Sequence, residues 1–232
     1  MDSMVNTERP HRNFYGRRKG KHLKQSHEVY LNEDLTALSP GIVSWEANPR
    51  RDYLDLEGLF AGRDIWLEIG FGGGEHVIHQ AFENPQVGII GCEPYINGVA
   101  MLLGKIRKAS VGNLKIYPGD VRDMFDVLPE DSISKAFLLY PDPWPKARHH
   151  RRRFVTSEHL EPLARVLKSG AEFRVATDIP DYVRQTLEEV PNTGFDLIDQ
   201  GAEPWEDWIC TRYEQKALRE GRTPHYLTFR RL

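Results

Sequence analysis

Cysteine is scarce in this chain of 232 residues. Only Cys92 and Cys210 are present, too few for the disulfide framework that stabilises many small secreted domains. The chain also lacks an apolar run of about eighteen residues, the length that a membrane-spanning helix requires. Its first residues are polar and basic, without the apolar stretch of a secretory signal. We therefore expect a protein of the reducing cytoplasm that does not enter the membrane.

Acidic residues are missing from two basic stretches, although the net charge of the chain is only −3. The first stretch contains Arg9, Arg12, Arg17, Arg18, Lys19, Lys21 and Lys24. Because few large apolar residues accompany them, we expect Met1 to about Ser26 to form an arm that is mobile when free. Its charge favours binding to nucleic acid, with a purely solubilising tail as the alternative. We divide the chain into a basic arm and lead-in, residues 1–55, and an organised domain, residues 56–232.

The second stretch without acids is a basic run that follows a proline-rich turn. The run consists of Arg148, His149, His150, Arg151, Arg152 and Arg153. Such a run repels itself unless it faces solvent or a polyanion, so its four arginines are candidate phosphate contacts. The turn before it is stiffened by three prolines, which alternate with Asp142, Trp144 and Lys146. A carboxylate, an indole and an ammonium group are thereby held at the end of the apolar strand Phe137–Tyr140.

Apolar segments of strand length alternate with segments of helix length from Asp64 onward. The predicted strands are 65–69, 87–92, 114–117, 137–140, 171–176, 195–198 and 226–229. The predicted helices are 74–82, 95–109, one through Leu160 to Leu167 that Gly170 would cap, and 180–189. This alternation predicts a doubly wound α/β domain with a mostly parallel sheet, whose ligands bind beyond the carboxyl ends of the strands.

Acidic residues stand at or just past five of the predicted strand ends. They are Glu68, Glu93, Asp120, Asp142 and Asp178. Any one of them has an alternative explanation as a helix cap or turn former, but five along one edge of a sheet indicate a ligand. A rim of carboxylates would repel phosphate groups and attract a cation.

Glycines follow the first strand, with Gly70, Gly72 and Gly74 before a predicted helix. They allow the backbone to approach a ligand closely. A dinucleotide fold would place a further glycine at the position of Glu75, so the spacing argues against that ligand class. The ammonium and sulfonium groups of S-adenosylmethionine suit the acidic rim, and Glu93 is placed to accept hydrogen bonds from ribose hydroxyls. We predict S-adenosylmethionine as the ligand.

Six segments of the chain resemble one known family, the bacterial tRNA (guanine-N(7)-)-methyltransferases. In chain order they are LEIGFGGGEH, GCEPY, PGDVRD, LLYPDPWPKARHHRRRF, ATDIPDYV and TRYEQKALREG. The resemblance covers nearly all of residues 64–232, and the block around PDPWPKARHHRRR is its most specific part. It implies a class I methyltransferase domain, S-adenosylmethionine as methyl donor, and the variable-loop guanine at position 46 of tRNA as substrate.

The resemblance also implies roles for individual residues. Around the donor it places Glu68, Glu93, Asp120 and Asp142, and it treats Asp142 as catalytic. On the RNA side it places Lys146, Asp178 and the run Thr211, Arg212, Tyr213 and Glu214. That run also fits a simpler interpretation, in which Thr211 caps a helix and Glu214 completes a capping box. The N-terminal arm carries none of the family's motifs, so its expected role in RNA binding rests on charge alone.

The chemistry of guanine N7 agrees with a site of this kind. N7 carries a lone pair and no proton, so methyl transfer to it needs placement rather than a general base. Asp142 is suited to orient the guanine and to offset the positive charge that develops on it. Two alternatives stay open: a methyltransferase for another RNA, a small molecule or a protein, and a non-catalytic RNA-binding module on the same fold. His76 and His79 are three residues apart, but without further ligands nearby we expect no metal site.

Overall fold

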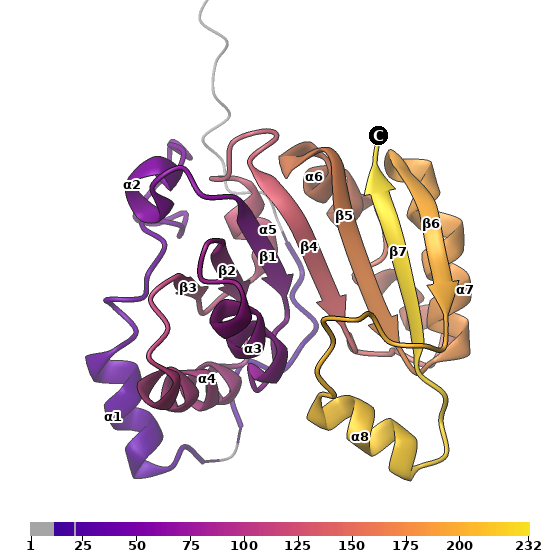
Figure 1. Cartoon of the computed structure of the whole chain (residues 1–232), viewed down its shortest axis with the longest axis horizontal. Coiled ribbons are helices and arrows are strands. Elements are labelled where there is room, and N and C mark those ends of the chain that lie inside the picture. The colour runs from indigo at the N-terminus through magenta and orange to yellow at the C-terminus, as the bar shows by residue number, and fades with distance from the viewer. Residues whose placement is uncertain (1–11, 21) are drawn as a thin grey trace, which may run out of the picture.

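The computed structural model describes residues 12–20 and 22–232, which form an α/β structure around a seven-stranded sheet (Figure 1). The strands are β1 (Ile65–Ile69), β2 (Gly88–Cys92), β3 (Leu114–Tyr117), β4 (Ile133–Leu139), β5 (Leu167–Thr177), β6 (Phe195–Gly201) and β7 (His225–Arg231). Their order across the sheet is β3-β2-β1-β4-β5-β7-β6. Strands β1 to β5 pair in parallel, and β7 pairs antiparallel with both β5 and β6. The predicted doubly wound, mostly parallel fold is confirmed.

Helices cover both faces of the sheet. They are α1 (Gln25–Glu33), α2 (Leu56–Phe60), α3 (Glu75–Glu83), α4 (Ile96–Ala109), α5 (Val121–Phe125), α6 (Ser157–Val166), α7 (Pro180–Glu189) and α8 (Arg212–Arg219), with 3-10 turns at Ala147–Arg152 and Pro191–Thr193. One core cluster joins β2 and β3 to apolar residues of α3 and α4, and the larger cluster joins the sheet to α5, α6 and α7. In Figure 1 helix α8 lies below the sheet, at the end toward which the arrows of β1, β4 and β5 point.

The apolar runs of the sequence explain the central strands. All five residues of β2 are buried, because helices cover the sheet on both sides there. Several predicted boundaries are wrong. Strand β4 begins at Ile133 and not at Phe137, β6 continues past Ile198 to Gly201, and Gly170 does not cap the helix that precedes it. Helix α6 ends at Val166, and Gly170 lies inside β5, which begins directly at Leu167. Leu167 pairs with Ile133 of β4, and the next pair, Glu172 with Lys135, follows after an irregular stretch that contains Gly170.

The lead-in to the sheet packs closely on the rest of the protein. Helix α1 lies beside α4, and Tyr30, Leu31 and Leu35 pack against the core cluster of β2 and β3. Val43 and Leu54 are buried in the larger core cluster. Residues 13–17 lie against the carboxyl ends of the strands. The other part of the predicted basic arm, residues 1–11 with Arg9 and the single position Lys21, lies outside the described residues.

Helix α8 begins as the sequence predicts, at the cap residue Thr211, whose hydroxyl accepts a hydrogen bond from the backbone N–H of Glu214 at 3.3 Å. The predicted capping box is wrong in its second half. The carboxylate of Glu214 turns inward, where it accepts hydrogen bonds from the indole N–H of Trp208 at 2.7 Å and from the hydroxyl of Tyr226. Glu214 is buried, so these two donors compensate part of the cost of removing its charge from water.

Candidate active site

A cavity of about 970 Å³ lies at the carboxyl ends of β1 to β4. Each of these strands contributes the residues that follow it, and further lining comes from the N-terminal segment, the basic run, the start of α6 and α8. The predicted site residues in its lining are Gly70, Gly72, Glu93, Asp120, Asp142, Arg151, Arg152 and Tyr213. The fold therefore brings most of the predicted donor-binding residues to one place, as expected for a doubly wound sheet.

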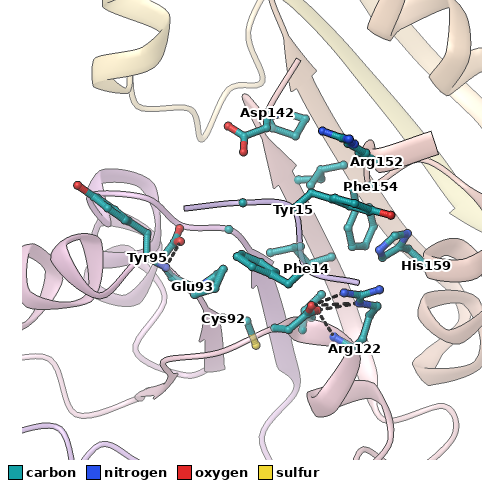
Figure 2. A pocket seen from close by; sticks show the side chains of 18 of the residues that line it. Phe14, Tyr15, Cys92, Glu93, Tyr95, Arg122, Asp142, Arg152, Phe154 and His159 are labelled. Atoms are coloured by element: carbon teal, nitrogen blue, oxygen red, sulfur yellow. Dashed lines mark hydrogen bonds and ion pairs between the residues drawn. The ribbon is translucent and has the colours of Figure 1, made fainter. Parts of the chain in front are cut away.

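Glu93 is a carboxylate of the cavity that two backbone donors hold in place. One of its oxygens accepts a hydrogen bond from the backbone N–H of Gly72 at 2.6 Å, and the other from that of Tyr95 at 2.8 Å. Burial raises the pKa of Glu93, although the two N–H donors act in the opposite direction, and the nearby charge of Asp142 raises it further. The side chain is thus held in one orientation by Gly72 and Tyr95, and Figure 2 shows it beside Tyr95.

Residues of α4 contact and support the glycine loop, residues 70–74. Gly72 has φ +55°, a left-handed conformation that glycine adopts without strain. Gly98 in the first turn of α4 lies so close to it that a Cβ at residue 98 would overlap the carbonyl oxygen of Gly72. Lys105, two turns further along α4, donates to the carbonyl of Gly73 and to the carboxylate of Glu75 at 2.7 Å. The glycine pattern predicted the loop but not these supports, because they come from a separate helix.

Asp120 caps helix α5 and is tied to one arginine. Its carboxylate accepts from the backbone N–H of Arg122 at 3.0 Å and from the guanidinium of Arg122. Burial alone would raise the pKa of Asp120, but these hydrogen bonds outweigh it and lower the pKa below its ordinary value. Arg122 also pairs with Glu158 at 2.9 Å and donates to the carbonyl of Asn13 at 3.0 Å. The arginine therefore connects the floor of the cavity to α6 and to the N-terminal segment.

Asp142 stands at the mouth of the cavity on the proline-rich turn after β4. Two nearby residues of this turn, Tyr140 and Trp144, have φ of +48° and +39°. Residues other than glycine rarely adopt this left-handed backbone conformation. Asp142 is exposed as a residue, and its carboxylate points into the cavity (Figure 2). Partial desolvation by the surrounding atoms raises the pKa of Asp142, and the positive charge of Arg17 opposes that rise. A carboxylate in this position is available to a ligand that reaches the cavity from outside.

Trp144 takes part in a stack at the same mouth. The guanidinium of Arg152 lies 4.9 Å from the centroid of the Trp144 ring and 4.7 Å from that of Tyr15. Tyr15 and Trp144 also meet edge to face, with ring centroids 6.4 Å apart. The indole is half-buried by these neighbours and still lines the cavity, so it is both a packing element and part of the wall.

Two of the five predicted rim acids lie elsewhere. Glu68 is inside β1 rather than at its end and is 3% exposed, with its carboxylate 2.6 Å from Nδ1 of His76. Asp178 follows β5 as predicted, but its carboxylate accepts a hydrogen bond from the guanidinium of Arg222. Neither lines the cavity. Side-chain direction along a strand alternates, and the sequence does not reveal which partner each acid meets.

The predicted RNA-binding residues also divide into exposed and buried groups. Lys146, Arg148 and Arg151 are exposed. Arg153 is only 1% exposed, because its guanidinium donates to the carbonyl of Pro143 at 2.9 Å and to Gln185 at 3.0 Å and pairs with Asp181 at 2.9 Å. The basic run forms a 3-10 turn in which Arg153, at its end, anchors the turn to α7. Arg153 is therefore occupied by protein partners, whereas Arg148 and Arg151 are exposed.

Thr211 and Arg212 lie beside the cavity without lining it. Thr211 is buried as the cap of α8, and the half-buried Arg212 packs along the glycine loop and over the ring of Tyr213, 4.9 Å from its centroid. Tyr213 itself is 45% exposed and reaches the cavity.

Several residues of the cavity wall were not predicted from the sequence. Phe154 and His159 form one wall, with ring centroids 4.9 Å apart, and Nδ1 of His159 lies 2.9 Å from the hydroxyl of Thr156. Burial, together with the charge of Arg122, lowers the pKa of His159 to about 4, which keeps its ring neutral at ordinary pH. Phe154 ends the segment LLYPDPWPKARHHRRRF but had no role assigned to it, and His159 lies outside all six segments.

Among the described residues there is neither a cluster of metal ligands nor a helix able to span a membrane. Within residues 12–20 and 22–232, no group of three or more histidine, cysteine or acidic residues is arranged to hold a metal ion. Nδ1 of His76 contacts the carboxylate of Glu68 instead. Over the same residues, no helix combines the length and the apolar character needed to cross a membrane.

Comparison with known proteins places this site in a family. The family model described as "Putative methyltransferase" matches residues 62–227, which is more than half of the chain. The tRNA (guanine-N(7)-)-methyltransferase of Ruegeria pomeroyi is 72% identical over 234 residues, covering 99% of both chains, and that of Jannaschia sp. is 71% identical over 96% of both. The chain belongs to the tRNA (guanine-N(7)-)-methyltransferase family. The family resemblance inferred from the six sequence segments is confirmed.

Solved structures place the family's fold among the methyltransferases. The 16S rRNA methyltransferase KamB aligns with a TM-score of 0.59 at 19% identity, covering 78% of this chain and 95% of that one. A 16S rRNA (adenine(1408)-N(1))-methyltransferase variant from Catenulisporales acidiphilia, solved with its cosubstrate SAM, aligns with a TM-score of 0.55 at 17% identity, covering 75% and 89%. At such identities the likeness concerns the fold alone. The family and the similar relatives show that this member of the tRNA (guanine-N(7)-)-methyltransferase family is an enzyme of the methyltransferase class.

Proposed function

We propose that the protein transfers a methyl group from S-adenosylmethionine to N7 of the guanine at position 46 in the variable loop of tRNA. The observation that carries the proposal is the cavity in which Glu93 and the glycine loop stand beside Asp142 and two arginines of the basic run, Arg151 and Arg152. The names of relatives that are 71–72% identical over nearly the whole chain support the same reaction. The cytoplasm, where tRNA is found in bacteria, is the proposed location.

The cavity suits an adenosyl donor that carries a positive charge. Desolvation raises the pKa values of two of its carboxylates, Glu93 and Asp142, and a bound sulfonium would oppose that rise. Arg122 is already paired with Asp120 and Glu158, so it does not provide a phosphate site there. We propose that Glu93 binds the ribose hydroxyls and that the backbone of Gly70 and Gly72 borders the rest of the donor. When bound, S-adenosylmethionine supplies the electrophilic methyl group.

Asp142 is the residue proposed to act on the guanine. The lone pair of N7 needs no proton removal, so the protein has to hold the base in line and to offset the positive charge that it gains. Correct placement of two reactants lowers the activation free energy by on the order of 7 to 11 kcal/mol. We propose that Asp142 accepts hydrogen bonds from N1–H and the exocyclic amine of guanine, which fixes the base and places a negative charge beside it.

The RNA side of the site is proposed to consist of exposed cations and one exposed ring. Lys146, Arg148 and Arg151 contact phosphates, and Tyr213 lies beside the substrate base. Arg152, which is held between two aromatic rings, completes this surface. The other predicted substrate residues are proposed to support the same surface. Asp178 does so through its hydrogen bond with Arg222. Thr211, Arg212 and Glu214 do so by forming the start of α8.

The test is to incubate the protein with isotope-labelled S-adenosylmethionine and tRNA that lacks modifications, and to map the product by mass spectrometry. We expect 7-methylguanosine in the variable loop. Absence of transfer to any RNA would refute the proposal. Transfer to another RNA or to a small molecule would show that the proposed substrate is wrong.

Asp142→Asn is the matched variant for that assay, since it keeps the shape of the side chain and removes the charge. We expect turnover to fall by roughly 10²-fold, the size of effect typical when one electrostatic interaction with the transition state is removed. Donor affinity should change less. A variant with full turnover would show that the charge of Asp142 is dispensable.

A further inference from the structure

An N-terminal strap, residues Arg12–Gly20, crosses the cavity and is fixed at its beginning. The guanidinium of Arg12 forms two hydrogen bonds with the carboxylate of Asp126, at 2.6 and 2.8 Å, and a third with Asp123 at 3.2 Å. Such a bidentate arrangement is among the stronger contacts that a partly exposed arginine makes. The carbonyl of Asn13 then accepts from Arg122. The strap is therefore anchored to α5 on one side of the cavity.

A second anchor holds the other end of the strap on α4. The backbone N–H of Ile96 donates to the carbonyl of Arg18 at 3.0 Å. The side chain of Asn97 accepts from the N–H of Gly20 at 2.8 Å and donates to the carbonyl of His22 at 3.1 Å. The first of these contacts uses a free N–H group at the start of α4, directly after Glu93 and Tyr95. The two anchors thus lie on opposite sides of the donor cavity.

Between the anchors, the strap forms part of the cavity wall. All five residues from Asn13 to Arg17 line the cavity. Phe14 points into it toward the side of Cys92 and Glu93, whereas Tyr15 points the other way, toward Arg152 and Phe154 (Figure 2). Among the described residues, the backbone of 14–17 makes no hydrogen bond with another backbone group, so this middle part is held by side chains and by its two ends. A segment of this kind opens at lower cost than a strand or helix.

The strap also reaches the residue proposed to act on guanine. Arg17 is the cation whose charge opposes the rise in the pKa of Asp142, and Tyr15 stacks with Arg152 and Trp144 at the cavity mouth. The strap is therefore continuous with both the donor cavity and the RNA side. A basic tail that served only as a diffuse RNA contact would need neither anchor.

We propose that the strap is the closing wall of the donor cavity, and that Arg12 and Asn97 are positioning residues that retain the donor by holding the strap shut. The inference rests on the proposed function, because the retained ligand is S-adenosylmethionine. Donor exchange then requires the strap to leave at least one anchor. Cutting either anchor should let the donor escape faster, without altering the residues that contact the reacting atoms.

Arg12→Ala and Asn97→Ala test the two anchors separately. Release of labelled S-adenosylmethionine is followed after addition of excess unlabelled donor. We expect each variant to release the donor roughly tenfold faster, a change within reach of removing charge-assisted or paired hydrogen bonds. The KM for the donor should rise in proportion, while kcat at saturating donor stays unchanged. Arg12→Lys should restore part of the retention, since it keeps the charge without the bidentate fork.

Lys19→Ala is the matched control, because it removes a positive charge from an exposed position of the same strap. If the strap serves only as a diffuse cation for tRNA, Lys19→Ala and Arg12→Ala should weaken tRNA binding alike and leave donor release unchanged, and the proposal is overturned. Thermal unfolding of each variant serves to check that it is folded. A wild-type protein that binds no donor would overturn the proposed function as well, whereas normal wild-type binding with unchanged release from both anchor variants overturns the strap alone.

Discussion

At the scale of single residues, Glu93 and Asp142 define the chemistry of the cavity. They carry charges of the same sign near one another, and for both of them desolvation raises the pKa. The protein therefore keeps two carboxylates in a state that is costly without a cation. This arrangement favours a positively charged ligand, because its attraction to the two carboxylates offsets part of the free energy lost through their desolvation.

The raised pKa values predict how donor binding depends on pH. The ionised carboxylates attract the donor, so affinity should be full at neutral pH and fall as the pH is lowered toward and through their pKa values, which lie above the ordinary 4.5 of Glu93 and 3.8 of Asp142. Calorimetric titration with S-adenosylmethionine between neutral and mildly acidic pH measures this decline. In Glu93→Gln, affinity at neutral pH should be weaker by about 1.5 to 3 kcal/mol, the worth of a charge-assisted hydrogen bond.

The same variant supplies the control for that prediction. Glutamine keeps one oxygen to accept from Gly72 or Tyr95 and does not titrate, so the pH dependence of Glu93→Gln should be shallower than that of the wild type. An identical pH profile in both proteins would show that Glu93 is a structural acid that holds the glycine loop, without a role toward the donor.

Individual residues were predictable where strand ends fixed their position. Glu93 and Asp120 follow the carboxyl ends of β2 and β3, and the alternation of strands and helices predicted both. Glu68 and Arg153 were assigned from their neighbours in the sequence, yet each points to a partner, His76 and Asp181, that the chain brings near only after folding. Local sequence indicates the place of a side chain along an element and not the group that it meets.

At the scale of elements, the basic run is a short 3-10 turn with exposed and buried arginines. This division predicts different consequences for substitutions of the same residue type. Arg148→Ala with Arg151→Ala should weaken tRNA binding and reduce its salt dependence by roughly 0.7 to 0.9 in log-log slope for each phosphate that is no longer bound. Fluorescence anisotropy with tRNA at several salt concentrations measures the slope. As a control, the affinity of the variant for the donor should equal that of the wild type.

Arg153→Ala is the contrasting variant of the same run. The carbonyl of Pro143 and the side-chain oxygen of Gln185 lose their donor, whereas Asp181 keeps Arg184 as a partner. We therefore expect a loss of about 1 to 3 kcal/mol in the free energy of unfolding and a correspondingly lower unfolding temperature. The change in salt slope should be smaller than for the exposed pair. An exposed pair with an unchanged salt slope would mean that the run is a solvated surface, and the RNA-binding residues would then lie elsewhere.

The contact between α4 and the glycine loop makes a second prediction at this scale. Gly98→Ala introduces a methyl group against the carbonyl of Gly72, so the loop or the helix must shift. We expect donor affinity to fall by about tenfold and stability by roughly 1 to 3 kcal/mol, the usual cost of overpacking. Gly112→Ala is the control, since a Cβ there meets no atom within 4 Å. Equal donor affinity in both variants would show that the loop adapts freely.

Some elements were predicted closely from their local pattern. The predicted helix 95–109 corresponds to α4, and the predicted strand 114–117 coincides with β3. Errors arose where tertiary pairing extends an element beyond its local pattern: β5 begins at Leu167, which pairs with Ile133 of β4, and regular pairing with β4 and β7 starts at Glu172, beyond Gly170. Strand pairing supplies hydrogen bonds that compensate for a weak local preference.

At the scale of the whole molecule, the fold class followed from the alternation of strands and helices, but the placement of the chain's beginning did not. The sequence reads as a charged arm and a weak lead-in. In the structure the lead-in completes the core with Val43 and Leu54, and its Leu38 carbonyl accepts from Ile116 of β3 at 2.8 Å. Contacts of this kind join residues far apart in the chain, which single-sequence patterns do not report.

Two truncations separate the roles of these segments. A chain that starts at residue 25 lacks the arm and the strap and keeps α1. We expect it to unfold within a few degrees of the full chain and to release the donor faster, because the strap contributes side-chain contacts at the cavity and little buried core. A chain that starts at residue 56 also loses Val43, Leu54 and the apolar side of α1. Burying such side chains contributes roughly 1.5 to 3 kcal/mol each.

Several such losses approach the whole free energy of unfolding of a typical domain, about 5 to 15 kcal/mol. The chain that starts at residue 56 should therefore lack a cooperative thermal transition in circular dichroism, and the chain that starts at residue 25 should keep one. If both chains unfold cooperatively near the temperature of the full protein, residues 1–55 stand outside the folding unit, and the division that composition suggests is also a physical boundary. If only the longer chain does so, the lead-in belongs to the methyltransferase core and the arm alone is the separable part.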